Sequence, residues 1–202
     1  TGDRVETPKW FNGSSNSFTY SAVFTADGTQ DDSVGLVCHN AFENDVVLQL
    51  GGSSVEVMIY RYGQSNISIS SDIILGVEQN VIATYDGSSL NLYVNGVQQA
   101  SVSTNEYIIN WDMGYDSNTL GYRWTDDPTG SMKGSIEEVT VWSRSLSADE
   151  IGNFYETLDN QEGLVSYYGF NEGSGSIVED LSENDNDGVI YGANWISNPL
   201  IG

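Results

Sequence analysis

The sequence predicts an all-β protein, and three observations lead to that expectation. Segments of strand length recur along all 202 residues, and they are rich in Val, Ile, Tyr, Phe and Thr. Gly, Asn, Asp and Ser separate these segments, as expected for turns. Only one stretch has the periodicity of a helix. Many short strands at close spacing are typical of an antiparallel sandwich or barrel rather than of a parallel α/β sheet.

The first long strand is expected in "SFTYSAVFTA", where alternate residues are large and apolar. Phe18, Tyr20, Ala22 and Phe24 fall on one face, because successive side chains of a strand point to opposite sides. Other segments of this kind follow along the chain. They read "SVGLVC", "DVVLQL", "SVEVMIYRY", "NISIS", "NVIATY", "LNLYVN", "VQQASVS", "SIEEVTVW", "LVSYYGF" and "GVIYGANW".

Residues 80–103 are expected to form a three-stranded antiparallel meander. "YDGSS" connects "NVIATY" to "LNLYVN", and "VNGV" then turns the chain back. The second turn contains Asn95-Gly96, which is the strongest short-range signal for a β-hairpin.

The single expected helix is "SADEIGNFYETL". Ser147 and Glu150 have the spacing of a capping box, which places the start of the helix. Apolar residues then follow on one face, and this stripe is expected to lie on the sandwich. The stripe consists of Ile151, Phe154, Tyr155 and Leu158.

The chain is strongly acidic, with 29 Asp and Glu against 6 Lys and Arg and a formal net charge of −23. Such a field repels nucleic acid and anionic membranes and attracts cations. The sequence has no apolar run long enough to span a bilayer. We therefore expect neither nucleic-acid binding nor membrane insertion. The one cysteine, Cys38, excludes an intrachain disulfide and is expected in the core.

Residue patterns argue against an enzyme. Hydrolysis of a glycosidic bond usually needs two suitably spaced carboxylates, and neither Glu43 with Asp45 nor the adjacent Glu137 and Glu138 forms such a pair. On a regular strand, Glu137 and Glu138 would point to opposite faces. His39 is the only histidine, which excludes zinc sites of several histidines. We expect it at the surface or rim, without a role alongside Cys38. No catalytic residue is assigned.

The segment "DLSENDNDG", Asp180 to Gly188, gathers four carboxylates in nine residues, together with two Asn. Calcium prefers six to eight oxygen ligands from carboxylates, amides, backbone carbonyls and water, and this loop offers many of them. It does not match the EF-hand pattern. The alternative is a turn rich in Asn and Asp whose charges are solvated.

Aromatic residues beside polar ones in expected loops are candidates for contact with a sugar ring. Such clusters occur in "NWDMGYDS", in "GYRWTDDPTG" and in "YRYGQ". The alternative is that these aromatics pack on their own loops. The candidate ligand-binding residues are Trp111, Tyr115, Tyr122, Arg123, Trp124, Tyr60 and Tyr62.

Four motifs in order resemble the laminin-G-like domains of the concanavalin A-like lectin/glucanase superfamily, in their bacterial secreted or surface form. They are "VIATYDGSSLNLYVNGVQQASV", "LGYR", "GSIEEVTVWSRSLSADEI" and "GLVSYYGFNEGSGSIVEDLSENDNDGVIYGANW". The resemblance extends over nearly the whole chain and implies a two-sheet jelly roll.

The resemblance also implies a structural calcium between the acidic loop and the strand that carries an "IDE"-like motif. That motif reads "IEE" here, with Glu137 in place of the usual Asp, and the longer side chain changes the geometry of this ligand. The implied ligand set is Asp180, Asn184, Asp185 and Asp187, with Glu137 or Glu138.

The family usually carries the "GLVSYYGF…" element at the start of a domain, whereas here it follows the helix. It either completes this domain or opens a following repeat. We expect completion, because "YYGF" and "VIYGANW" need a partner sheet to bury their aromatics. Residues 1–202 are thus expected to form one domain, with residues 163–195 completing the sandwich, as a monomeric module of a longer chain.

The expected function is a non-catalytic carbohydrate-binding module of a secreted or cell-surface protein, stabilised by calcium. One alternative is a protein-interaction or adhesion module of the same fold, with an extracellular protein as its partner. Another is an accessory domain of a polysaccharide-degrading enzyme. The fold alone does not choose among these functions.

Overall fold

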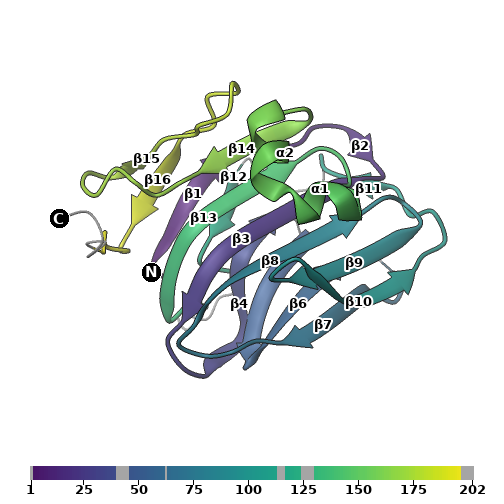
Figure 1. The fold of residues 1–202 in the computed structure, drawn as a ribbon, viewed down its shortest axis with the longest axis horizontal. Coiled ribbons are helices and arrows are strands. Elements are labelled where there is room, and N and C mark those ends of the chain that lie inside the picture. The colour runs from purple at the N-terminus through teal and green to yellow at the C-terminus, as the bar shows by residue number, and fades with distance from the viewer. Residues whose placement is uncertain (1, 40–45, 62, 113–116, 124–129, 197–202) are drawn as a thin grey trace.

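The computed structural model of the chain is a sandwich of two antiparallel sheets, which confirms the predicted fold class (Figure 1). It describes residues 2–39, 46–61, 63–112, 117–123 and 130–196. No helix among these residues has the length and apolar character that a bilayer crossing requires.

The larger sheet contains eight of the described strands. In spatial order they are β15 (Ile177–Val178), β16 (Gly188–Tyr191), β1 (Arg4–Pro8), β12 (Ser117–Leu120), β4 (Gln30–His39), β5 (Val46–Gly52), β6 (Ser54–Ile59) and β7 (Ile67–Asp72). The smaller sheet is ordered β10 (Val97–Ser103), β9 (Ser89–Val94), β8 (Glu78–Tyr85), β3 (Phe18–Ala26), β13 (Gly134–Trp142) and β14 (Leu164–Tyr168). A short ladder joins β2 (Ser14–Ser15) to β11 (Ile109–Asn110).

The core lies between the two sheets and follows the predicted alternation. Phe18, Tyr20, Ala22 and Phe24 of β3 are at most 1% exposed. Facing residues of the larger sheet, such as those on alternate positions of β5 and β6, belong to the same apolar cluster. Each buried side chain of this size contributes about 1.5–3 kcal/mol by leaving water. This layer therefore holds the two sheets together.

The predicted meander is confirmed. β8 pairs with β9 and β9 pairs with β10, both antiparallel. Asn95 and Gly96 have positive φ values of 50° and 75°. Both residues of a type I′ turn need this left-handed conformation, which Asn and Gly accept readily.

The predicted helix is two short helices, α1 (Ala148–Gly152) and α2 (Phe154–Asn160). The capping box of Ser147 and Glu150 is present as expected. The helix is interrupted at Asn153, so the apolar residues before and after this position do not form the continuous stripe that was predicted. As a result Tyr155, predicted to face the sandwich, is 68% exposed, while Thr157 is buried in its place.

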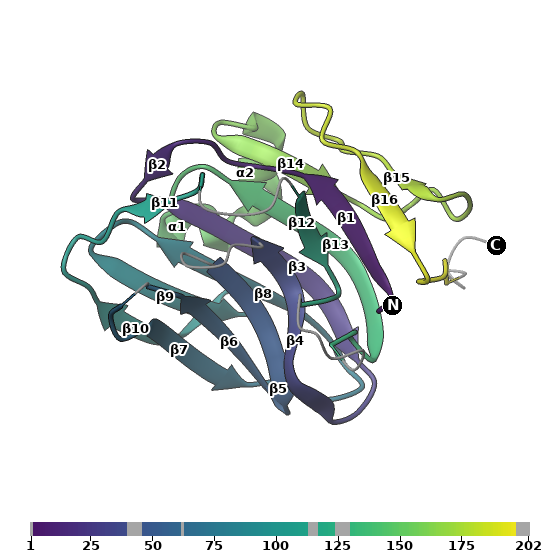
Figure 2. The ribbon, with the colours of Figure 1, turned by 180° about the vertical axis from the view of Figure 1, so that it is seen from behind.

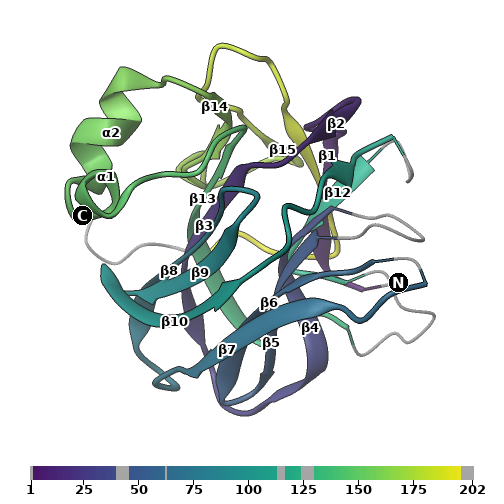
Figure 3. The same ribbon diagram turned by 90° about the vertical axis from the view of Figure 1, so that its right-hand side faces the viewer.

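Both helices lie on the side of the smaller sheet that faces away from the larger sheet (Figure 3). A second apolar cluster fills the space beneath them. It consists of Ile82, Tyr93, Trp142, Leu146, Ile151, Leu158 and Leu164. The helices therefore cover one outer face of the sandwich, while the outer face of the larger sheet has no helix among the described residues.

The C-terminal segment adds strands to both sheets. β14 pairs with β13 of the smaller sheet, and β16 pairs with β1 of the larger one. Figure 2 shows β16 beside β1, so the two ends of the described chain come together at one edge of the sandwich. The aromatics of this segment were predicted to be buried; Tyr168 is fully buried, whereas Tyr191 of β16 is 43% exposed and does not fit that prediction.

Candidate functional site

The outer face of the larger sheet carries a cluster of polar and aromatic side chains, which we call the Arg123 cluster: Gln49, Glu56, Tyr60 and Arg123. Gln49 of β5 and Glu56 of β6 are direct partners in the ladder, so their side chains share a face. The neighbours Leu48 and Leu50 point into the core. Gln49 therefore belongs to the opposite, outer face.

Hydrogen bonds connect the members of the Arg123 cluster. The Gln49 amide donates to Glu56 Oε2 at 2.7 Å. Arg123 donates from Nη1 to Gln49 Oε1 at 2.5 Å and from Nη2 to the Tyr60 hydroxyl. Its guanidinium carbon lies 5.0 Å from the centre of the Tyr60 ring, within the range of a cation–π contact. The cluster thus presents a ring beside carboxylate and guanidinium groups, which the buried amide of Gln49 holds in place.

Arg123 reaches this face because the segment after β12 passes very close to β4. A Cβ atom on Gly35 would lie 2.6 Å from the carbonyl oxygen of Tyr122, so only glycine allows this approach. Thr119 of β12 also donates from its hydroxyl to the same carbonyl, at 2.7 Å. These contacts fix the backbone from which Arg123 extends toward Gln49.

The predicted ligand-binding residues meet different outcomes. Tyr60 and Arg123 come together, as the clusters suggested. Tyr122 lies toward the N-terminal strand, with its ring centre 5.9 Å from the Arg4 guanidinium carbon. Gln49 and Glu56 join them through hydrogen bonds, and ligand binding by these residues stays a prediction. Tyr62, Tyr115 and Trp124 lie outside the described residues.

Trp111 was wrongly predicted to contact ligand, because it is a core residue with no exposed surface. Its ring centre is 4.5 Å from that of Phe11 and 6.1 Å from that of Phe18. Its indole N–H donates to Ser15 Oγ at 3.2 Å. The β2–β11 ladder turns Trp111 inward, so its ring cannot stack on a sugar.

His39 was wrongly predicted to lie at the surface, whereas it is fully buried. Its ring is edge-on to Trp111 with a centroid distance of 4.9 Å. Burial lowers the pKa of His39 to about 4, and the charge of Lys9 contributes in the same direction. The imidazole is therefore neutral at pH 7. Cys38 is buried as predicted.

Asp180 organises the acidic loop through hydrogen bonds to both carboxylate oxygens. Oδ1 accepts from the backbone N–H groups of Tyr167 and Ser182, at 2.8 and 3.1 Å. Oδ2 accepts from the Ser182 hydroxyl at 2.8 Å and from the N–H of Asn186 at 2.9 Å. Protein donors therefore balance this buried charge.

Amide side chains of the same loop cover the open edge of β14. Asn184 donates to the carbonyls of Leu164 and Val165, both at 3.1 Å. Asn186 donates to the Val165 carbonyl at 2.9 Å. Leu181 N–H donates to the Tyr167 carbonyl at 2.8 Å. The loop thus supplies hydrogen bonds that a further strand would otherwise make.

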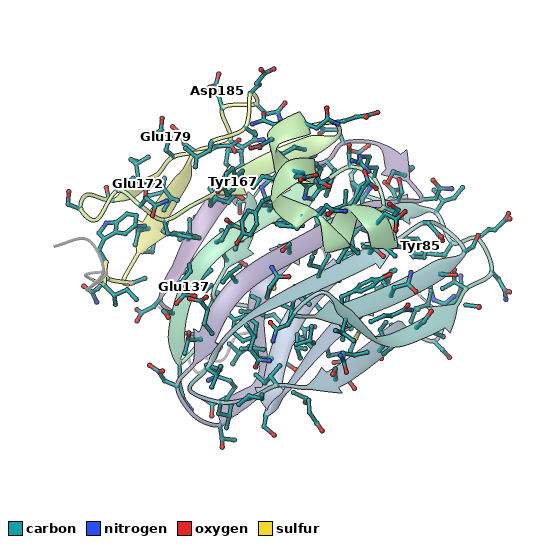
Figure 4. The ribbon with its side chains drawn as sticks, in the orientation of Figure 1. Tyr85, Glu137, Tyr167, Glu172, Glu179 and Asp185 are labelled. Atoms are coloured by element: carbon teal, nitrogen blue, oxygen red, sulfur yellow. The ribbon has the colours of Figure 1, made fainter. Side chains whose placement is uncertain are left out.

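Glu137 and Glu138 do not join this loop. Figure 4 shows Glu137 near the start of β13 and Asp185 at the exposed tip of the loop. A bulge between Ile136 and Glu138 breaks the regular alternation assumed from the sequence. Glu138 accepts from the Tyr167 hydroxyl at 3.2 Å, and Glu137 accepts from Ser135. Burial raises the pKa of both glutamates.

The predicted calcium ligands therefore do not fit a calcium cage. Among the residues with a described placement, no group of three or more His, Cys, Asp and Glu is arranged to hold a metal. The oxygens of Asp180 already accept hydrogen bonds, and the glutamates of β13 lie elsewhere. Calcium binding itself stays a prediction.

Sequence reasoning missed Gln49 and Glu56. A signal was present, because Gln49 is the one polar residue in the apolar run "VVLQL". A polar residue in such a run indicates a position on the strand whose side chain does not face the core.

The family model Laminin_G_3, described as the Concanavalin A-like lectin/glucanases superfamily, matches residues 1–152. The chain belongs to the concanavalin A-like superfamily. The match contains the Arg123 cluster but ends before β14 and the acidic loop. Three of the described strands, β14, β15 (Ile177–Val178) and β16, therefore lie outside the residues that the family model matches.

Solved structures of similar fold include several glycan-binding proteins. A putative carbohydrate binding protein from Bacteroides ovatus has a TM-score of 0.64 and 18% identity, with 94% of this chain covered and 59% of that one. The Ruminococcus gnavus IT-sialidase CBM40 bound to α2,3-sialyllactose has a TM-score of 0.60 and 16% identity, with 76% and 94% covered. At sequence identities this low, the similarity shows that the chain shares the fold of these proteins.

Mouse laminin α1 domains LG4–5 are also similar, with a TM-score of 0.56 and 17% identity, covering 73% of this chain and 41% of that one. A comparison with curated proteins gives no match for this member of the superfamily.

Proposed function

We propose that this chain is a non-catalytic carbohydrate-binding module of a secreted or cell-surface protein. The observation that carries the proposal is the Arg123 cluster on the outer face of the larger sheet, which no helix covers among the described residues. A sugar ring needs an aromatic surface for its C–H groups and polar groups for its hydroxyls. Tyr60 provides the first, and Glu56 and Arg123 provide the second, both held by Gln49, which is itself 4% exposed.

Glycan binding by proteins of the same fold supports this proposal. Structures of similar fold include a sialidase module bound to sialyllactose and an arabinanase domain in complex with arabinotriose. The sandwich is thus a scaffold that other proteins use to hold oligosaccharides. The fold does not assign the sugar, which depends on the side chains of the site.

The expected ligand is a neutral or weakly charged glycan. The net charge of −23 repels polyanions. Arg123 is already engaged with Gln49 and Tyr60, and Glu56 lies next in the same hydrogen-bonded chain. One guanidinium beside a carboxylate does not neutralise a sulfated or uronate polymer.

The test compares wild type with Tyr60→Ala by titration against a panel of neutral and acidic oligosaccharides. Loss of the ring should weaken binding at least tenfold, because stacking area and a hydrogen-bond partner disappear together. Tyr155→Ala is the matched control, since Tyr155 is a tyrosine 68% exposed on α2, on the opposite face of the molecule. Its removal should leave binding unchanged.

A second variant separates the ring from its hydroxyl. Tyr60→Phe keeps the aromatic surface and removes only the acceptor for Arg123, so binding should fall less than in Tyr60→Ala. Equal affinity in wild type and Tyr60→Ala would move the binding site away from the Arg123 cluster. Absence of binding to every glycan would contradict the proposal.

A protein-interaction module is the second candidate, because laminin LG domains share the fold. Enzymatic deglycosylation of a captured partner distinguishes the two functions, and the Tyr60→Ala and Tyr155→Ala variants show whether the Arg123 cluster makes the contact. If the chain is a protein-interaction module, immobilised wild-type protein should capture an extracellular protein. This binding should survive enzymatic removal of the captured protein's glycans. Loss of capture after deglycosylation supports carbohydrate binding.

A further inference from the structure

A cavity of about 160 Å³ lies between the two sheets, at the edge where the chain ends come together. Its floor and walls are formed by apolar side chains from both sheets and from the C-terminal segment. They include Val5, Leu120, Ile136, Phe170, Ile190 and Trp195. Val5 and Leu120 are 7% and 1% exposed, so the floor lies at the level of the core.

The cavity exists because the two sheets differ in width at this edge. β14 pairs with β13 only along Val139–Trp142, so the Gly134–Ile136 end of β13 is paired with β3 on one side and has no described strand on its β14 side. The larger sheet, in contrast, extends past β1 at this edge by adding β16, whose Ile190 lies opposite Val5. Side chains of the larger sheet therefore face a space that the smaller sheet does not fill.

Trp195 forms one wall of this space. Its indole N–H donates to the Gly175 carbonyl at 2.8 Å, which anchors the ring to the turn before β15. The ring packs against the apolar core while remaining partly exposed. This hydrogen bond therefore fixes the large Trp195 side chain beside the cavity.

The mouth of the cavity is polar. Asp3 and Asn194 line it and are exposed, and Ser135 lies at the same end of β13. Arg4 also lines the mouth, but Glu6 balances its charge at 2.6 Å. The mouth therefore offers hydrogen-bonding groups without a free positive charge, in a strongly acidic protein. These features favour an uncharged ligand over an anion.

We propose that this cavity binds a small uncharged ring compound that carries a hydroxyl group, of the size of phenol or cyclohexanol. A cavity of about 150 Å³ lined by Leu, Ile and Phe holds one benzene molecule, which sets the scale. Most small-molecule sites combine apolar walls with few polar groups, as this one does. The site is separate from the Arg123 cluster and does not depend on glycan binding.

The experiment uses methionine methyl groups as reporters, titrating the full chain with phenol and with cyclohexanol. Met132 lines the cavity, whereas Met58 is on β6, on the far side of the larger sheet from it. In protein labelled with ¹³C at the methionine methyl groups, each compound should shift the Met132 signal saturably and leave Met58 unchanged. Glucose, which carries a hydroxyl group on most of its ring carbons, should leave the Met132 signal unchanged.

Ile136→Phe fills the cavity and should weaken binding of both compounds at least tenfold. Ile69→Phe is the matched control, because Ile69 is also partly buried against the core but lies on β7 at the opposite edge. It should bind as wild type does. Trp195→Ala removes one wall of the cavity and should weaken binding of both compounds. Because Trp195 is partly exposed, this change should leave the buried core undisturbed.

Absence of a saturable Met132 shift in wild type would overturn the proposal, whatever the variants do. Unchanged affinity in both Ile136→Phe and Trp195→Ala would overturn it as well. Glycan titration of Ile136→Phe separates the two sites, since binding at the Arg123 cluster should persist when the cavity is filled.

Discussion

The acidic loop at 180–187 and the Glu137–Glu138 pair on β13 contain the same functional group in opposite environments. Asp180 is 6% exposed, and its carboxylate accepts four hydrogen bonds. The two glutamates are half-buried, and Glu137 Oε2 and Glu138 Oε1 have no hydrogen-bond partner. Both regions looked like parts of one cation site in the sequence.

The difference shows that the density of carboxylates does not reveal how their charge is balanced. The loop places its buried carboxylate where backbone N–H groups of β14 and of the loop itself converge. Each glutamate instead accepts a hydrogen bond from one hydroxyl group, of Ser135 for Glu137 and of Tyr167 for Glu138. A buried carboxylate with donors stabilises the fold, whereas one that lacks them opposes it.

The largest expected effect comes from Asp180→Ala, which removes four hydrogen bonds and leaves buried N–H groups without acceptors. We expect a loss of about 3 kcal/mol in the free energy of unfolding, measured by urea denaturation. Asp185→Asn is the control within the same loop. Asp185 is exposed and has a φ of 55°, a conformation that Asn accepts, so its change should stay within about 0.5 kcal/mol. Equal losses in both variants would remove the distinction.

The next effect concerns His39, the buried base. Its folded-state pKa of about 4 lies below the unfolded value of 6.5, so the unfolded chain binds the proton more readily. Stability from this group is fully present above pH 6.5 and is lost as pH falls toward 4, by about 3 kcal/mol. Urea denaturation of wild type and His39→Leu between pH 4 and 7 checks this. A parallel pH dependence in both proteins would exclude His39 as the cause.

A smaller and opposite effect is expected at β13. Burial raises the folded-state pKa of Glu138, so the folded state holds the proton more tightly than the unfolded one. The resulting loss of stability appears as pH rises above the unfolded pKa. Glu138→Gln should therefore stabilise the protein at pH 7 by less than about 1 kcal/mol, because water screens a partly exposed group. This gain in stability should vanish below pH 4. If Glu138→Gln instead destabilises the protein at pH 7, the charge of Glu138 stabilises the fold.

The smallest effect is expected from calcium. Because the Asp180 oxygens are occupied and the glutamates lie elsewhere, melting temperatures with calcium and with chelator should agree at matched ionic strength. A ligand that binds only the folded state would raise stability by about 2.7 kcal/mol at a hundredfold excess over its dissociation constant. A rise of that size, abolished by Asp187→Asn, would contradict this expectation and support calcium binding at the acidic loop.

Local sequence patterns predicted much of the fold. The alternation of apolar and polar residues predicted the buried face of β3. Asn95-Gly96 predicted a hairpin, and Ser147 with Glu150 predicted the start of a helix. Each of these features depends on residues close together in the chain. The break at Asn153 was missed because the apolar spacing of Ile151, Phe154 and Leu158 fits one continuous helix, whereas Gly152 and Asn153, both weak helix formers, marked the interruption.

The candidate site depended on contacts between distant segments and was predicted only in part. Arg123 meets Gln49 across 74 positions of sequence, and Trp111 meets Ser15 across 96. A loop aromatic looks the same in the sequence whether it is exposed or buried. For Trp111, the two-residue ladder of β2 and β11 decides the matter, and no pattern of that length is recognisable in advance.

The side chains that cover β14 also affect how this protein behaves in concentrated solution. An uncovered edge strand is a template on which another chain can add a strand, which is how fibrils begin. At this edge the Val165 carbonyl and both backbone groups of Tyr167 already have partners within the chain. A second copy could add here only by breaking those bonds. The loop therefore protects this edge against strand addition and fibril growth.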